Sequence, residues 1–216
     1  ISIENITGSS SDDILSGDGG VNVLQGRDGN DLLTGRDGDD ELYGEVGNDT
    51  LAGNAGTDTI DGGDGTDTAD YSSSVDGITL FLTSGTGVGG DAEGDTIIDI
   101  ENVIGSSSGG DHLRGTDGVN ELSGLGGNDL LEGSGGDDTL IGGDDDDTLI
   151  GGTGGDVLQG GNGFDIADYG TSTAGVTVDL TDPGNVLGGD AASDTLFDIE
   201  GIYGTTLADH LIGSTA

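Results

Sequence analysis

The chain of 216 residues contains 49 glycines, one proline, no cysteine and no tryptophan, and its formal net charge is −41. This composition excludes an ordinary globular core, and the missing three-residue glycine period excludes a collagen helix. Nucleic acid is excluded as a partner because it requires a basic surface. Disulfide bonds are excluded by the lack of cysteine, and no apolar run is long enough for a membrane span.

The acidic residues are biased toward the shorter side chain. Of 44 acids, 36 are Asp and 8 are Glu, against three arginines and no lysine. A solvated acidic surface usually mixes the two, so the bias favours placed metal ligands. Charge and hydropathy alone predict a disordered chain. We expect disorder without metal and a folded chain with it.

A nine-residue repeat organises the sequence. We expect the tail of a preceding unit (1–7), an array of seven nonapeptides (8–70), a spacer (71–105), a second array of seven (106–168), a second spacer (169–203) and the start of a third array (204–216). Equivalent positions in successive units lie 98 residues apart, from Gly8 to Ser106 to Gly204. We therefore expect the chain to be part of a longer tandem protein.

Two places of the nonapeptide are nearly invariant along the chain. The sixth place holds Asp13, Asn22, Asp31, Asp40, Asp49, Asp58 and Asp67, then Asp111, Asn120, Asp129, Asp138, Asp147, Asp156 and Asp165. The eighth place holds Leu, Ile or, in the last repeat of each array, Ala69 or Ala167. We interpret the eighth place as the buried residue of a short strand.

Each spacer contains one alternating stretch, Ile78, Leu80 and Leu82 or Val176, Val178 and Leu180. Alternation with a period of two predicts a half-buried strand. We expect the spacers to continue the coil with longer strands rather than to form separate globules. The sequence predicts no helix.

The repeat predicts a flat coil of two nonapeptides per turn. We expect glycines at the first and fourth places to adopt backbone angles closed to other residues. With one inward side chain per strand, the next repeat must return on the opposite face, so 18 residues complete a turn. Successive turns then stack as parallel strands about 4.8 Å apart.

Stacking brings sixth-place carboxylates of loops n and n+2 together, as in Asp31 with Asp49. Like charges held this close require a cation between them. All available ligands are oxygens, which suit calcium better than zinc or copper, and magnesium demands a stricter octahedron.

The nonapeptide resembles the G-G-x-G-x-D-x-U-x unit of the RTX (haemolysin-type) family. The resemblance implies an all-β, right-handed parallel β-roll with calcium between loops n and n+2. It implies that the lower loop supplies the carbonyls of places two and four with its Asp, and that the upper loop supplies the carbonyls of places one and three with its Asp. Five such pairs in each array imply about ten Ca²⁺ ions.

Besides the sixth-place side chains, the resemblance assigns ligand roles to the first four places of the repeats, namely Ser9, Ser11, Asp18, Gly20, Gly26, Arg27, Asp28, Gly29, Gly35, Arg36, Asp37, Gly38, Gly44, Glu45, Val46, Gly47, Gly53, Ala55, Gly62, Asp64, Ser107, Gly109, Thr116, Gly118, Gly124, Leu125, Gly126, Gly127, Gly133, Ser134, Gly135, Gly136, Gly142, Gly143, Asp144, Asp145, Gly151, Thr153, Gly160 and Asn162. The pairs Asn22/Asp40 and Asn120/Asp138 are expected to be the weakest, because Asn offers a neutral oxygen. Serines make the first loop of each array a poorer match. Asp145 replaces a fourth-place glycine, and Asp tolerates a left-handed backbone better than most residues.

Three classes of function are weighed. The first is a calcium-folded structural module of a secreted or cell-surface bacterial protein, of adhesin or surface-layer type. The second is an accessory module of a secreted protease, lipase or alginate epimerase. The third, an enzyme in its own right, is disfavoured because no nucleophile–base pair is evident. The resemblance also implies export by type I secretion from a Gram-negative cell. A surface polysaccharide or a second copy remains open as a partner.

Overall fold

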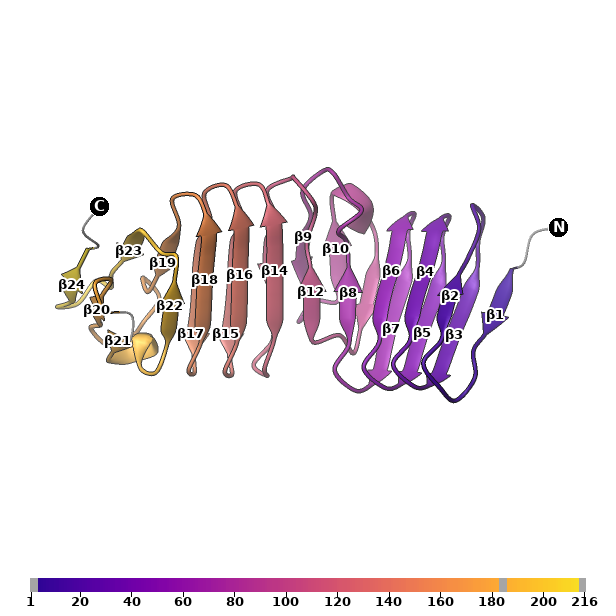
Figure 1. Cartoon of the computed structure of the whole chain (residues 1–216), viewed down its shortest axis with the longest axis horizontal. Helices are drawn as coiled ribbons and strands as arrows, with labels where there is room; N and C mark the ends of the chain where they lie inside the picture. Colours follow the sequence, from indigo (N-terminus) through magenta and orange to yellow (C-terminus); the bar gives the residue numbers. More distant parts are fainter. Residues whose placement is uncertain (1–3, 183–185, 214–216) are drawn as a thin grey trace. The chain divides into compact units, whose positions relative to one another are not determined.

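The computed structural model describes residues 4–182 and 186–213 and divides into two compact units, Ile1–Gly109 and Gly110–Ala216 (Figure 1). Both units are parallel β-coils, so the predicted all-β roll is confirmed. No α-helix occurs in the described part of the chain. In that part, no helix is long and apolar enough to cross a lipid bilayer.

The first array and the segment before it form two facing sheets. Their strands are β1 (Asn5–Thr7), β2 (Ile14–Ser16), β3 (Val23–Asp28), β4 (Leu32–Asp37), β5 (Glu41–Val46), β6 (Thr50–Ala55), β7 (Thr59–Asp64) and β8 (Thr68–Asp70). Strands alternate between the sheets, so β1, β3, β5 and β7 pair in parallel and β2, β4, β6 and β8 do the same. The register is 18 residues, as in Leu33 opposite Leu51, which confirms two nonapeptides per turn.

The second array repeats this arrangement. Its strands are β13 (His112–Arg114), β14 (Glu121–Gly126), β15 (Leu130–Gly135), β16 (Thr139–Asp144), β17 (Thr148–Thr153), β18 (Val157–Asn162) and β19 (Ile166–Asp168). One sheet pairs β13, β15, β17 and β19, and the other pairs β14, β16 and β18.

The core of each unit is a ladder of eighth-place side chains. Leu24, Leu33, Leu42 and Leu51 are fully buried, and so are their counterparts in the second array. The neighbouring seventh-place and ninth-place side chains are exposed or half-buried in strands such as β4 and β6. Each strand therefore contributes one aliphatic side chain to a narrow core, as the period predicts.

The spacers contain shorter strands than the arrays, so the prediction of longer strands is wrong. The first holds β9 (Thr79–Phe81), β10 (Thr86–Val88), the 3₁₀ turn η1 (Gly90–Ala92), β11 (Thr96–Ile98) and β12 (Asn102–Ile104). The second holds β20 (Thr177–Asp179), β21 (Val186–Leu187), the 3₁₀ turn η2 (Gly189–Ala191), β22 (Thr195–Phe197) and β23 (Gly201–Tyr203), and β24 (His210–Ile212) follows it.

Each spacer inserts an antiparallel element and then returns to the coil. In the first spacer β10 pairs antiparallel with both β9 and β11, and in the second β20 pairs antiparallel with β21. The coil resumes where β11 pairs in parallel with β7 and β12 with β8, and likewise β22 with β18 and β23 with β19. The expectation that the spacers continue the coil therefore holds for their second halves.

The left-handed backbone positions of the repeat are the second and fourth places. Second-place residues reach φ values such as 89° at Arg36 and 77° at Glu45, and fourth-place Gly47 reaches 148°. Asp145 has φ 77°, so its left-handed backbone was predicted correctly. The described positive-φ residues include no first-place glycine. The expectation of unusual backbone angles at the first place is therefore wrong. A constraint other than backbone conformation requires glycine there.

Shortening one side chain of the leucine ladder tests this core. Leu51→Ala in saturating calcium should lower the free energy of unfolding by about 2–5 kcal/mol, because a fully buried leucine leaves a cavity. Urea unfolding followed by circular dichroism measures the change. Ile14→Ala is the control: its side chain is 81% exposed, so a change beyond about 0.5 kcal/mol is not expected. Equal effects of the two variants would contradict the proposed core.

Candidate metal centre

The sixth-place side chains lie inside the loops rather than on the surface. Asp40, Asp49 and Asp58 are each 1% exposed and Asp67 is fully buried. The second array buries Asp129, Asp138, Asp147, Asp156 and Asp165 in the same way. Buried carboxylates are rare unless they are paired, hydrogen-bonded or bound to metal.

One oxygen of each buried carboxylate ties two loops together. The backbone N–H of Asp31 donates to Oδ1 of Asp49 at 2.7 Å, and that of Asp49 donates to Oδ1 of Asp67 at 2.7 Å. In the second array, Asp129 donates to Asp147 at 2.8 Å and Asp147 to Asp165 at 2.9 Å. The structure thus brings the residues of loops n and n+2 together as predicted.

The other oxygen of these carboxylates is buried without a hydrogen-bond partner. Ten described residues share this feature, namely Asp31, Asp40, Asp49, Asp58, Asp67, Asp129, Asp138, Asp147, Asp156 and Asp165. Buried polar atoms are nearly always satisfied, and each exception calls for an explanation such as an ion.

The first-place glycine makes room for this unpartnered oxygen. A methyl group at Gly44 would collide with Oδ2 of Asp49 and would lie 2.5 Å from the carbonyl oxygen of Gly62. A methyl group at Gly26 would meet Asp31 Oδ2 and the Gly44 carbonyl in the same way. The carboxylate of one loop and the first-place carbonyl of the loop above therefore border one small space.

Carbonyls of the second and fourth places also face the loop above. The carbonyl oxygen of Glu45 lies against Gly63, and the carbonyl oxygen of Gly29 lies against Gly47. Third-place carbonyls are already used in part: Val46 accepts the N–H of Gly29 at 3.0 Å, and Asp64 accepts that of Gly47 at 2.9 Å. Each still has a second lone pair, so these carbonyl oxygens can accept a further contact.

The donor set suits a hard cation. In residues 4–182 and 186–213, no three His, Asp or Glu side chains gather around one metal-sized point. An ion in the gap would therefore take most of its ligands from backbone carbonyls, with carboxylates adding charge. Calcium accepts six to eight such oxygens in flexible geometry, so these residues fit it.

Comparison with known families agrees with this geometry. The family model described as "RTX calcium-binding nonapeptide repeat (4 copies)" matches residues 3–33, 16–51, 34–69, 106–140 and 132–167. The chain belongs to the RTX calcium-binding repeat family. The RTX matches cover both arrays, and a search of the curated proteins finds no match to the chain.

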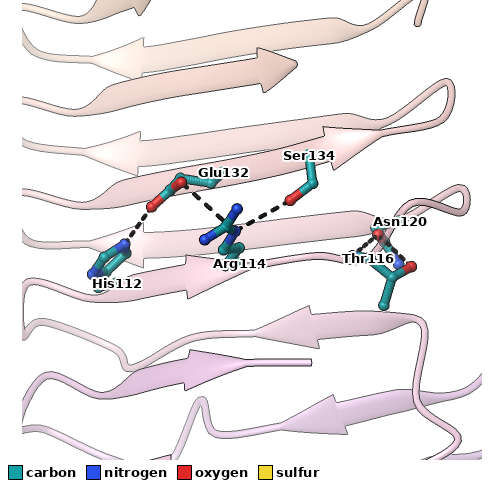
Figure 2. Close-up of polar contacts among 6 residues, drawn as sticks. All are labelled: His112, Arg114, Thr116, Asn120, Glu132 and Ser134. Carbon is teal, nitrogen blue, oxygen red and sulfur yellow. Dashed lines mark hydrogen bonds and ion pairs between the residues drawn. The ribbon is translucent and has the colours of Figure 1, made fainter. Parts of the chain in front are cut away.

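The first two RTX loops of the first array and the second loop of the second array differ from the loops that follow them. Asp13 Oδ2 accepts the N–H of Ser9, and Oδ1 of Asn22 accepts the N–H of Asp18 at 2.8 Å. Figure 2 shows the equivalent of the latter contact in the second array, where Thr116 N–H donates to Asn120 Oδ1 at 2.7 Å. These side-chain oxygens are already satisfied by hydrogen bonds, and the weakness of the pairs with Asn22 and Asn120 stays a prediction.

His112 and Arg114 lie on the outer face of the second RTX array. Figure 2 shows Glu132 between His112, whose Nε2 is 2.6 Å from Oε1, and Arg114, whose Nε is 3.8 Å from Oε2. Arg114 also donates to the hydroxyl of Ser134 at 3.3 Å. We interpret this cluster as a cross-strand contact on the surface.

Burial raises the pKa of several RTX carboxylates. It raises the pKa of Asp58 to about 7, that of Asp147 to about 7 and that of Asp129 to about 8. Hydrogen bonds from the loop below oppose the shift, and neighbouring carboxylates add to it. The loops therefore hold protons readily when no cation neutralises them.

Four further carboxylates, which were not among the predicted ligands, extend the RTX ladder into the spacers. Asp95 Oδ1 accepts the N–H of Asp58 at 2.7 Å, and Glu101 Oε2 accepts that of Asp67 at 2.8 Å. Asp194 and Glu200 make the same contacts in the second unit, at 2.9 and 3.0 Å. Asp95 and Asp194 each precede a Thr and an aliphatic residue, and Glu101 and Glu200 each follow an Ile, but none of the four lies at nine-residue spacing from the arrays.

Adding a methyl group at the first place tests the RTX loop geometry. Gly44→Ala should lower the free energy of unfolding in calcium by about 1–3 kcal/mol, because the methyl group overpacks the space beside Asp49. The calcium midpoint of folding should rise correspondingly. Gly19→Ala is the control, because a methyl group there has no neighbour within 4 Å. Unchanged calcium binding in Gly44→Ala would contradict the assigned role of the first place.

The raised pKa values predict a pH dependence of the metal-free chain. The folded-state pKa exceeds the ordinary 3.8 at Asp58, Asp129 and Asp147. Their stabilising contribution is therefore full below about pH 4 and is lost as the pH rises through about 7–8. Circular dichroism in chelator should show more strand at about pH 5 than at about pH 8, and saturating calcium should remove the difference. Equal strand signals at both pH values in chelator would contradict this account.

Proposed function

We propose that this chain is a calcium-binding structural module that folds when Ca²⁺ binds after export. In this proposal it forms a rigid segment of a larger secreted or cell-surface bacterial protein of adhesin or surface-layer type. The observation that carries the proposal is the series of ten buried, unpartnered carboxylate oxygens inside the loops. Such oxygens are costly in the folded chain unless a cation is bound beside them.

The proposed ions lie between loops n and n+2. One site would use the carbonyls of Arg27 and Gly29 with Asp31, and the carbonyls of Gly44 and Val46 with Asp49. The same scheme gives five sites in each array and ten Ca²⁺ in all. Six of these pairs have a lower carboxylate with an unpartnered oxygen, contributed by Asp31, Asp40, Asp49, Asp129, Asp138 and Asp147.

The free energy of calcium binding is large enough to make calcium a requirement for folding rather than an addition to a chain that is already folded. At a calcium concentration ten times the dissociation constant, each site contributes about 1.4 kcal/mol, so ten sites contribute roughly 14 kcal/mol. The total stability of a typical domain is about 5–15 kcal/mol. A chain with formal net charge −41 also repels itself when no cation is bound.

The affinity expected of such sites favours a location outside the cell. Extracellular calcium modules bind at about 10⁻⁴–10⁻³ M, whereas intracellular sensors bind far more tightly. A chain with sites in the weaker range stays unfolded during synthesis and folds where calcium is abundant. This order of events suits type I secretion from a Gram-negative bacterium, which we include in the proposal.

A calcium titration of the purified chain tests this proposal. Far-UV circular dichroism should show a disordered chain in chelator at about pH 7.5 and a cooperative gain of strand as Ca²⁺ is added. Mg²⁺ at the same concentration should give little change, because it demands a stricter octahedron and keeps its waters. A full strand signal in chelator would refute calcium-driven folding.

A further inference from the structure

The unpartnered carboxylates extend further along each column than the nonapeptide pairs require. In the pairs between array loops, Asp58, Asp67, Asp156 and Asp165 act only as upper partners, yet each carries a buried oxygen with no hydrogen bond. Asp67 and Asp165 are fully buried. Within the arrays this oxygen borders the first-place carbonyl of the loop above, as Asp49 Oδ2 borders the Gly62 carbonyl, and above Asp67 and Asp165 that loop belongs to a spacer.

The loop above Asp67 belongs to the first spacer and presents oxygens to it. A methyl group at Gly62 would lie 2.6 Å from Asp67 Oδ2 and would collide with the carbonyl oxygen of Asp99. The backbone N–H of Asp67 donates to Glu101 Oε2 at 2.8 Å. Asp99 therefore occupies the position that a first-place glycine occupies elsewhere, and Glu101 occupies the position of the sixth-place Asp.

The second unit contains the same arrangement. A methyl group at Gly160 would lie 2.6 Å from Asp165 Oδ2 and would collide with the Asp198 carbonyl. The N–H of Asp165 donates to Glu200 Oε2 at 3.0 Å. Asp99 and Asp198 share a left-handed backbone, with φ 46° and 50°. Two separate segments of the chain thus build one geometry.

The loop that carries Glu101 is shorter than the loops of the arrays. Buried residues Ile97 and Val103, in successive strands, are six positions apart, whereas eighth-place residues of the arrays are nine apart. The shorter loop keeps the backbone contact of the arrays, because the N–H of Asn102 donates to the Asp67 carbonyl at 2.9 Å, as that of Thr50 donates to the Asp31 carbonyl at 2.9 Å. The second spacer has the same length between Leu196 and Ile202.

We propose that each spacer completes an additional divalent-cation site, formed by Asp67 with the Asp99 carbonyl and Glu101, and by Asp165 with the Asp198 carbonyl and Glu200. The ligand is Ca²⁺, as in the arrays, because every donor is a carboxylate or carbonyl oxygen. The inference rests on the proposed function of the arrays. It adds two ions to the ten, and it makes the spacers part of the calcium-folded structure.

Charge supports the assignment. Burial raises the pKa of Asp67 to about 6, against the hydrogen bond from Asp49, and the negative charges of Asp49, Glu101 and Asp61 add to the effect. Burial likewise raises the pKa of Asp165, where Glu200 and Asp198 are among the neighbouring charges. A cation between the loops would relieve this repulsion.

Counting bound ions tests the inference. Native mass spectrometry of the whole chain in CaCl₂ should show one Ca²⁺ fewer for Glu101→Gln, one fewer for Glu200→Gln, and two fewer for the double variant. Gln keeps an oxygen that can accept the N–H of Asp67, so the ladder is preserved while the charge is lost. Glu93→Gln is the matched control from the same spacer. Its carboxylate accepts the N–H of Gly89 at 2.8 Å, and it should keep the full count.

The outcomes separate this inference from the proposed function. If the wild-type chain binds no calcium, the proposed function fails and this inference fails with it. If the wild type binds calcium but Glu101→Gln and Glu200→Gln keep both its ion count and its calcium affinity, the spacer sites alone are refuted. Circular dichroism in saturating calcium confirms that each variant is folded. If the variants do not fold there while Glu93→Gln does, raising the calcium concentration should restore strand, and failure to restore it would overturn the inference.

Discussion

The structure depends on one electrostatic constraint: carboxylates are stacked inside the coil every 18 residues, and ten of the described ones have one oxygen without a hydrogen-bond partner. Asp31, Asp49 and Asp67 form such a column, in which each carboxylate accepts a backbone N–H from the loop below. That hydrogen bond fixes the register but satisfies only one oxygen. In the proposed function, the second oxygen makes the folded state dependent on a cation or, at lower pH, on a proton. The proposed dependence on calcium therefore arises from the same side chains that set the geometry.

The need for glycine at the first place of the repeat follows from this constraint. The first-place glycine adopts ordinary backbone angles and is required because the carboxylate and the carbonyl above it fill the space of a Cβ. The second place takes a left-handed backbone with residues as large as Arg36 and Leu125. Left-handed angles cost such residues roughly 1–2 kcal/mol each. Strand pairing such as Arg36 with Asn54 and the proposed ions between loops must offset that cost.

Much of the fold and of the site could be predicted from the nine-residue period. The period gives the two strands per turn, the register, the leucine ladder and the columns of sixth-place side chains, because each depends only on spacing along the chain. The antiparallel pairing of β9, β10 and β11 could not be predicted, since strands of three residues carry too little pattern. The left-handed second place was missed because residues such as Glu45 give no signal for it. Glu101 was missed because it lies 34 residues from Asp67, outside the 18-residue rule.

The two columns of each unit end in different ways, and the difference shows what the spacer does. One column passes from Asp67 to Glu101, where a carbonyl and a carboxylate again surround an unpartnered oxygen. The other passes from Asp58 to Asp95, whose Oδ2 accepts the hydroxyl of Tyr71 at 2.9 Å. Burial raises the pKa of Tyr71 well above its ordinary value, so this hydroxyl keeps its proton. Tyr169 and Asp194 repeat the contact in the second unit at 3.0 Å. At this end of the column, a neutral hydroxyl therefore satisfies the carboxylate oxygen whose counterpart within the array would contact a cation. One loop below, Oδ2 of Asp58 and of Asp156 still has no hydrogen-bond partner. Each spacer thus ends one column on a carboxylate that a hydroxyl satisfies and leaves the other column suited to an ion.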